Sequence, residues 1–204
     1  MSYAARSLAI IRTVLMTDAP AATIATVAVR APAPPHAADG LGPTASELLD
    51  FVRRTAVDTE LIDSLPLDPE GRTWIRLDGP GGSEAWIIGW PPGTGTGWHD
   101  HGGSRGAFAA AAGELTEQSL AAQLPTEGWK TLELADDVDR ERRLSDGRGR
   151  AFGPHHVHEV FNASADRHAV SVHAYYPPLP LMRRYSRNGP VLRLEEVERP
   201  EGWE

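Results

Sequence analysis

Two short histidine-rich segments constrain the fold of this chain more than any other feature. The first reads Gly-Trp-His-Asp-His-Gly-Gly over residues 97–103, and the second reads Gly-Pro-His-His-Val-His-Glu over residues 153–159. Residues i and i+2 of a strand point to the same face, so His99 and His101 can meet one metal ion from a single strand. A third ligand must come from another strand, and we expect His158, because an apolar run follows it. The fold must therefore bring these two distant segments together.

The residue types available in the chain restrict the kind of metal site. The chain has no cysteine, which excludes a thiolate site and leaves histidine, carboxylate and backbone oxygen as ligands. His155 and His156 stand in the loop before the strand, where exposed histidines are common, and we do not count them as ligands. Imidazole suits iron, nickel, copper and zinc, so the ligand set alone leaves the metal open.

The rest of the chain from residue 72 onward reads as short strands. Apolar or alternating runs are separated by turns that draw on the 20 glycines and 17 prolines of the chain. No helical segment is interleaved with them, which favours an antiparallel barrel or sandwich. The strands that we expect cover residues 74–77, 84–90, 107–115, 130–134, 159–162 and 169–176.

The N-terminal part has a different character. Thr44 is a good N-cap and Glu47 completes a capping box, so the sequence predicts a helix over residues 45–61 whose apolar face packs on the barrel. Residues 1–40 are rich in alanine, proline and threonine, and we expect a flexible arm there, followed by one domain over residues 41–204. A natural start at Met16 is the alternative.

Charge and hydropathy exclude several classes of protein. The formal net charge is −8 and the basic residues are spread out, so we expect no nucleic-acid partner. No run approaches the roughly 20 apolar residues that a membrane helix needs, and no signal peptide is evident. We therefore expect a cytoplasmic protein without a membrane partner, either a monomer or a weak homo-oligomer.

The histidine segments resemble the two cupin motifs. The first cupin motif reads Gly, five residues, His-X-His, three or four residues, Glu, six residues, Gly. Gly93 and Gly113 stand at its glycine positions on either side of the two histidines. The second motif ends in His-X3-Asn, which His158 and Asn162 match. The resemblance implies an all-β, cupin-type antiparallel β-barrel (a double-stranded β-helix or jelly roll) with the N-terminal helix packed outside.

One departure from the first motif narrows the resemblance. The usual glutamate is absent, because Arg105 and Gly106 occupy its two alternative places. Loss of that glutamate is typical of the cysteine dioxygenase (thiol dioxygenase) family, whose bacterial type this chain resembles over about half of its length. Some members of that family carry a cysteine linked to a tyrosine. Gly106 stands at the matching position, so such a link cannot form here.

The segment after the second motif extends the resemblance. Ser171, His173 and Tyr175 are similar to the Ser-His-Tyr relay of the family. Their alternation places all three side chains on one strand face. The resemblance gives them a catalytic role, and it implies that Arg76 holds the substrate carboxylate with two parallel hydrogen bonds.

The resemblance implies iron(II)-dependent oxygenation of the sulfur of a small aminothiol by O2, with L-cysteine giving cysteine sulfinate as the leading case. Nickel or another divalent metal is an alternative occupant of the site. A further rearrangement of the product in a specialised pathway stays open. So do another thiol substrate such as 3-mercaptopropionate, a diketone or flavonoid substrate, and a non-enzymatic metal-binding cupin.

Overall fold

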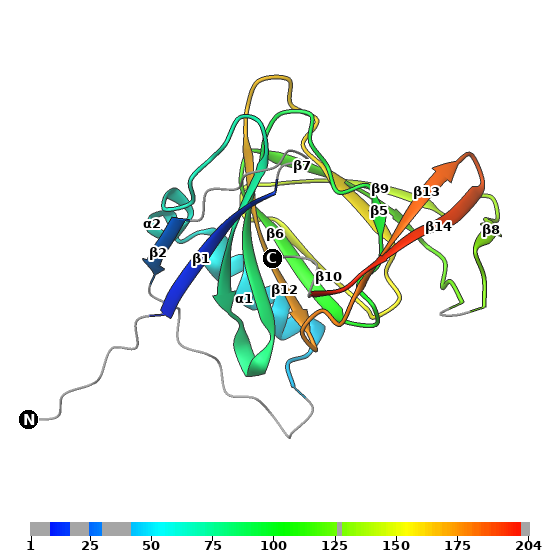
Figure 1. The fold of residues 1–204 in the computed structure, drawn as a ribbon, viewed down its shortest axis with the longest axis horizontal. Coiled ribbons are helices and arrows are strands. Elements are labelled where there is room, and N and C mark those ends of the chain that lie inside the picture. The colour runs from blue at the N-terminus through cyan, green and yellow to red at the C-terminus, as the bar shows by residue number, and fades with distance from the viewer. Residues whose placement is uncertain (1–8, 17–24, 30–41, 126–127, 201–204) are drawn as a thin grey trace, which may run out of the picture.

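The computed structural model describes residues 9–16, 25–29, 42–125 and 128–200, which form two seven-stranded antiparallel sheets with helices outside (Figure 1). The predicted all-β, cupin-type fold is confirmed. The first sheet has the order β10 (Gly149–Phe152), β6 (Arg105–Ala112), β12 (Ala169–Tyr176), β4 (Glu84–Trp90), β3 (Arg72–Asp78), β1 (Ala9–Met16) and β2 (Ala25–Val29). The second has the order β8 (Thr131–Glu133), β14 (Val191–Glu198), β13 (Met182–Asn188), β5 (Trp98–His99), β11 (His158–Phe161), β7 (Glu114–Leu120) and β9 (Asp139–Ser145).

Strand β12 is buried on both faces, and the two faces have different chemistry. Val170, Val172 and Ala174 belong to a cluster that also contains the apolar residues of the helices. Tyr175 belongs to a second cluster, between the sheets, that includes Trp90. Because successive strand residues point to opposite faces, one strand separates a helix-covered apolar layer from the interior of the barrel.

The N-terminal helical segment begins as predicted but is two helices rather than one. Helix α1 (Ala45–Ala56) has the complete capping box between Thr44 and Glu47. The chain then leaves the helix at Val57, and Asp58 caps a second short helix, α2 (Thr59–Asp63). The single helix predicted over residues 45–61 is therefore wrong at its C-terminal end, because Asp58 accepts a hydrogen bond from the backbone of Leu61 and so starts a new helix.

Helix α1 packs on the outer face of the first sheet, against β6, β12 and β10. Its buried residues include Leu48 and Val52, and they share a core cluster with Ala107 and Ala109 of β6. Small side chains on β6 give the larger helix residues room against the sheet. The predicted packing of the helix on the barrel is confirmed.

The strand predicted over residues 107–115 also divides in two. Gly113 has φ +66, and the chain turns there from β6 into β7 of the other sheet. A Cβ at this position would lie 2.8 Å from the carbonyl oxygen of His168, so glycine is required by both the backbone conformation and the space. This turn is one of the places where the chain passes from one sheet to the other.

Two parts of the N-terminal 40 residues are strands. β1 pairs with β3 and with β2, which extends the first sheet at its edge. Met16, the alternative start, is the last residue of β1. The other parts of the proposed arm lie outside the described ranges, so the division into an arm and a domain stays a prediction. Within the described ranges, none of the helices has the length and apolar character required to cross a bilayer.

We expect Thr44→Ala to lower the free energy of unfolding by about 1 kcal/mol, because the backbone N–H of Glu47 loses its acceptor, the Thr44 hydroxyl. Urea denaturation should show a lower midpoint with an unchanged slope. Ser46→Ala removes a hydroxyl from the first turn of the same helix and serves as the control. Equal midpoints for the two variants would contradict a stabilising role for the cap.

Candidate metal centre

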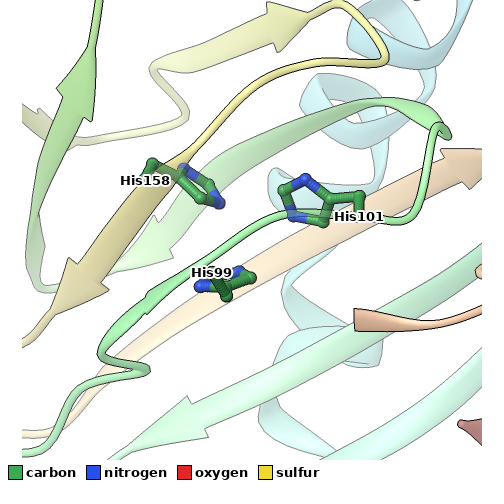
Figure 2. A group of neighbouring side chains, drawn as sticks. All are labelled: His99, His101 and His158. Carbon is green, nitrogen blue, oxygen red and sulfur yellow. The ribbon is translucent and has the colours of Figure 1, made fainter. Parts of the chain in front are cut away.

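Three buried histidine rings meet inside the barrel, and they are the three that the sequence predicts. His99 of β5 lies opposite His158 of β11 in the strand register, and His101 follows in the turn after β5. The ring centroids lie 4.7 to 5.0 Å apart, and one nitrogen from each ring lies within 4.8 Å of the others. Figure 2 shows the three rings pointing toward one another from these two segments.

The nitrogen atoms of this group suit a metal ion. His99 Nδ1 lies 3.0 Å from the Gly97 carbonyl oxygen, and His158 Nδ1 lies 2.9 Å from Glu117 Oε1. Each contact leaves the ring's Nε2 for another partner. In the described part of the chain, both ring nitrogens of His101 are buried without a hydrogen-bond partner. A buried polar atom without a partner is costly, and a metal ion would satisfy it.

Burial also keeps two of these rings in the form that binds metal. The pKa of His99 and that of His101 lie well below the ordinary histidine value, first because burial disfavours the charged ring and then because His158 lies nearby. Neutral imidazole is the metal-binding form. The predicted histidine set therefore fits a mononuclear divalent metal ion.

The predicted Ser-His-Tyr series lies on one face of β12 and is hydrogen-bonded throughout. Ser171 Oγ lies 2.7 Å from His173 Nε2, and His173 Nδ1 lies 3.1 Å from the Tyr175 hydroxyl. Trp90 Nε1 donates to Ser171 Oγ at 2.8 Å, which extends the series by one residue that the sequence did not predict. Burial lowers the pKa of His173 to about 3 and raises the pKa of Tyr175 above its ordinary value, so both rings are neutral near pH 7.

Tyr175 stands beside the histidine group. Its ring is stacked on that of His101 with 5.1 Å between centroids, and Gly106 is its cross-strand partner. A Cβ at Gly106 would lie 2.9 Å from Tyr175 Cδ1 and 2.6 Å from Phe152 Cζ. Glycine at position 106 therefore leaves space for the two aromatic rings that flank His101.

A cavity of about 140 Å³ opens on one side of the histidine group. His99, His158, His173 and Tyr175 are among the residues that line it. Most of its remaining wall is apolar and includes Trp74, Trp86, Ile88, Trp90, Val160, Leu179 and Met182. An apolar wall lowers the effective dielectric constant next to the histidines, which strengthens charge interactions made there.

The structure does not bring Arg76 into this cavity. Its side chain is 61% exposed, pairs with Glu84 at 3.5 Å and lies over the ring of Trp86. Two other arginines, Arg72 and Arg184, line the cavity, and neither was predicted from the sequence. Arg72 is four residues before Arg76 on β3, so the strand alternation could have pointed to it, whereas Arg184 comes from a strand that the sequence did not predict.

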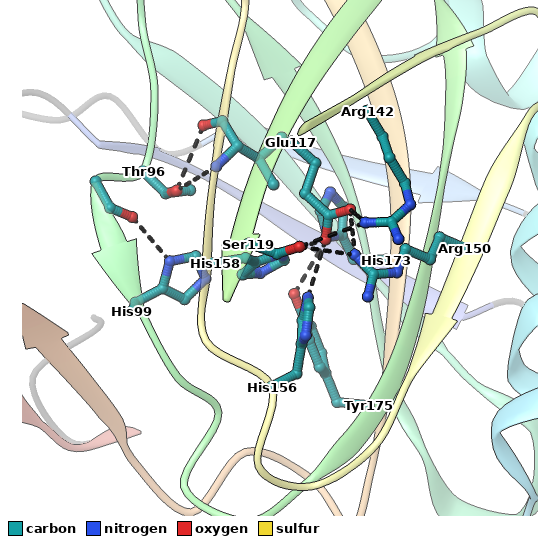
Figure 3. Close-up of polar contacts among 12 residues, drawn as sticks. Thr96, His99, Glu117, Ser119, Arg142, Arg150, His156, His158, His173 and Tyr175 are labelled. Atoms are coloured by element: carbon teal, nitrogen blue, oxygen red, sulfur yellow. Dashed lines mark hydrogen bonds and ion pairs between the residues drawn. The ribbon is translucent and has the colours of Figure 1, made fainter. Parts of the chain in front are cut away.

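A second polar group, also not predicted from the sequence, lies behind His158. His156 is buried rather than exposed, and its Nε2 lies 2.9 Å from the same Glu117 oxygen that His158 contacts (Figure 3). Burial alone would raise the pKa of Glu117. The hydrogen bonds from His156 and His158 and the charge of Arg150 outweigh it, so the pKa of Glu117 lies below the ordinary value. One signal was available, because Glu117 is in phase with the buried Leu115 of the same strand.

One comparison with known proteins shows a family that covers most of the chain. The family model for cysteine dioxygenase type I matches residues 33–188. No protein of curated function matches the chain. Among solved structures, oxalate oxidase is 20% identical with a TM-score of 0.40, over 53% of this chain and 52% of that one. This chain thus matches about half the length of oxalate oxidase.

Two further solved structures are similar at the same low level. A protein from Thermus thermophilus is 20% identical with a TM-score of 0.36, over 47% of this chain and 73% of that one. A DMSP lyase from Ruegeria pomeroyi is 17% identical with a TM-score of 0.34, over 54% and 44%. None of these structural likenesses transfers an activity to this chain.

We expect His101→Ala to weaken the binding of iron(II) by at least about tenfold, because one of three ligands is lost. Chelator competition on anaerobic protein, with metal content from elemental analysis, measures the change. His155→Ala is the matched control, since His155 is exposed in the loop before β11. Equal iron affinity in the two variants would remove His101 from the ligand set.

Proposed function

Because this chain belongs to the cysteine dioxygenase type I family, we propose that it is an iron-dependent thiol dioxygenase with L-cysteine as its leading substrate. The thiol and O2 combine to give the sulfinic acid, so both oxygen atoms end on sulfur and no other reductant is consumed. The observation that carries the proposal is one cavity lined by His99, His158 and Tyr175, with the ring of His101 stacked on that of Tyr175. This is a three-histidine group without a carboxylate among its members.

His99, His101 and His158 would hold the iron. A bound iron(II) ion supplies the redox chemistry that allows O2 to react with a thiolate, and it lowers the pKa of the thiol. The three histidines would contribute no negative charge of their own, so the site would favour an anionic sulfur ligand. The apolar wall formed by Trp90, Val160 and their neighbours keeps water away from that sulfur.

We infer one direction of proton donation along the hydrogen-bonded series on β12, and it leaves the Tyr175 proton free to point into the cavity. An indole N–H only donates, so Ser171 accepts from Trp90 and can give its own proton to His173 Nε2. His173 then carries its proton on Nδ1 and donates it to the Tyr175 oxygen. The phenol proton stays available for a substrate or O2 in the cavity, which gives Tyr175 an orienting and proton-holding role.

The carboxylate of cysteine needs a cation in the cavity. Arg76 remains a candidate on resemblance, but we favour Arg72, because it lines the cavity and its guanidinium lies 5.4 Å from the centre of the Trp90 ring. Arg184 also lines the cavity, where it donates two hydrogen bonds of 2.8 and 2.9 Å to Glu198, and it is the second candidate to bind the carboxylate.

Other functions remain as alternatives to be tested. The same site would accept 3-mercaptopropionate, which lacks the amine, and a later rearrangement of the product is compatible with the same cavity. A non-enzymatic cupin would bind the metal but consume no O2. We expect a monomer or a weak homo-oligomer in the cytoplasm, acting on a small thiol without a nucleic-acid or membrane partner.

Oxygen uptake by the iron(II)-loaded protein should rise with L-cysteine, and mass analysis should find a product heavier by two oxygen atoms. The same measurement with 3-mercaptopropionate and cysteamine shows which thiol supports the fastest oxygen uptake. Tyr175→Phe should retain iron but lose most of the uptake, because the proton that faces the cavity is removed. An iron-loaded protein that consumes no O2 with any of the three thiols would contradict the proposed function.

We expect Arg72→Gln to raise the KM for L-cysteine by at least about tenfold, because a charged hydrogen-bond donor to the carboxylate is lost. Steady-state oxygen uptake measures it. Cysteamine, which has no carboxylate, is the control substrate and should keep its KM. If instead Arg76→Gln raises the KM for cysteine and Arg72→Gln does not, the carboxylate is held at the position that the family resemblance implied.

A further inference from the structure

Glu117 is a carboxylate with no exposed surface, and it lies immediately behind one member of the histidine group. It stands on β7, which pairs with β11, so that its cross-strand partner is Val160. Its side chain is 0% exposed. A buried carboxylate is costly unless its charge and its lone pairs are both satisfied, and Figure 3 shows how this happens here.

The two oxygen atoms of Glu117 contact different partners. Oε1 accepts from His158 Nδ1 and from His156 Nε2, each at 2.9 Å. Oε2 pairs with Arg150 and lies 3.8 Å from an Arg142 nitrogen. The arginines compensate the charge, so the carboxylate stays ionised and can only accept hydrogen bonds.

This arrangement fixes the proton of His158. An ionised carboxylate at Nδ1 requires that Nδ1 carry the proton, which leaves the lone pair of Nε2 for the opposite side of the ring. That side is where His99 and His101 lie. A carboxylate that accepts from a ligand imidazole also makes the imidazole a stronger donor to a metal ion.

We propose that Glu117 is a positioning residue of the metal centre, which sets the tautomer and orientation of His158 and strengthens it as a ligand, with Arg150 holding the carboxylate in place. The inference rests on the proposed three-histidine centre but not on which thiol is oxidised. It also explains why β7 carries a fully buried acid. The motif glutamate that would have bound metal directly is absent at positions 105 and 106. Glu117 instead contacts the ligand His158 through a hydrogen bond.

A competing interpretation is that Glu117, His156 and His158 bind a second metal ion, since their ligand atoms also lie within 4.8 Å of one another. The arginines argue against it. Arg150 already occupies Oε2, and Arg142 adds a second positive charge close by. A divalent ion placed there would be repelled by both cations. Metal stoichiometry separates the two interpretations.

The test uses the full chain loaded with cobalt(II), in which the Nδ1–H protons of bound histidines give separate, strongly shifted NMR signals. In the wild type, His99 and His158 should each give a slowly exchanging signal, because both protons have buried acceptors, the Gly97 carbonyl and Glu117. Glu117→Gln should shift the His158 signal and speed its exchange while the His99 signal stays. Cobalt affinity, from chelator competition, should fall about 10- to 100-fold.

Two further variants separate positioning from general damage. Glu114→Gln removes an exposed carboxylate from the same strand and should change neither the signals nor the affinity. The double variant E117Q/R150Q removes the arginine that Glu117→Gln alone leaves without its partner. If the lost negative charge beside His158 is the cause, the double variant keeps the weak affinity and the altered signal even where its metal-free fold is as stable as the wild type.

Four results would overturn the proposal. One is an unchanged His158 signal and affinity in Glu117→Gln. Another is recovery of the His158 signal and of the cobalt affinity in the double variant. The changes in Glu117→Gln would then come from the uncompensated charge of Arg150. A third is two metal ions per wild-type chain, falling to one in Glu117→Gln. The fourth concerns the wild type alone, and it is a spectrum in which only the His99 signal exchanges slowly. Inactivity toward thiols, with these readouts as expected, would count against the proposed function and leave this inference standing.

Discussion

The burial of three imidazole rings at the junction of β5 and β11 is the constraint on which the rest of this structure depends. The register that places His99 opposite His158 puts polar rings in the interior of a barrel, where an unpaired nitrogen is costly. The Gly97 carbonyl and Glu117 satisfy one nitrogen on each of those two rings, and His101 has no such partner among the described residues. The metal ion that we propose would satisfy all three rings together.

The surrounding strands are arranged to make that burial tolerable. β12 presents an apolar face to helix α1 and a hydrogen-bonded polar face to the cavity, so neither layer contains an unpaired group from Ser171, His173 or Tyr175. On the other side of the histidines, Glu117 and two arginines form a compensated charge cluster. The three-histidine group thus lies between a neutral hydrogen-bonded series and an ionic one.

Patterns that depend on near neighbours in the sequence could be predicted. The capping box at Thr44 and the alternation along β12 are local, and the structure has both. His99 and His101 also come together, but not from a single strand as predicted, because β5 ends at His99. What could not be predicted depends on long-range register or on charge in strands with little apolar pattern. β9 is mostly exposed and charged, so no apolar period marked it.

The positions of the charged residues of the site could not be predicted from local sequence patterns either. Arg76 and Arg72 share a strand face, and no sequence pattern indicates how far along that face the cavity extends. His156 was expected to be exposed because it lies in a loop. It is buried, and it is hydrogen-bonded to Glu117, which lies 39 positions earlier in the chain. Contacts of this kind become visible only when two strands from different parts of the chain are paired.

A crystal structure of the iron(II)-loaded protein, with the metal located by anomalous scattering, would show which residues bind the ion. We expect one iron ion bound by His99, His101 and His158, with Glu117 contacting His158 and not the metal. An iron ion held by Glu117, His156 and His158 would contradict this expectation, because the three-histidine group would then not be the metal centre and the cavity beside it would lose its chemical role.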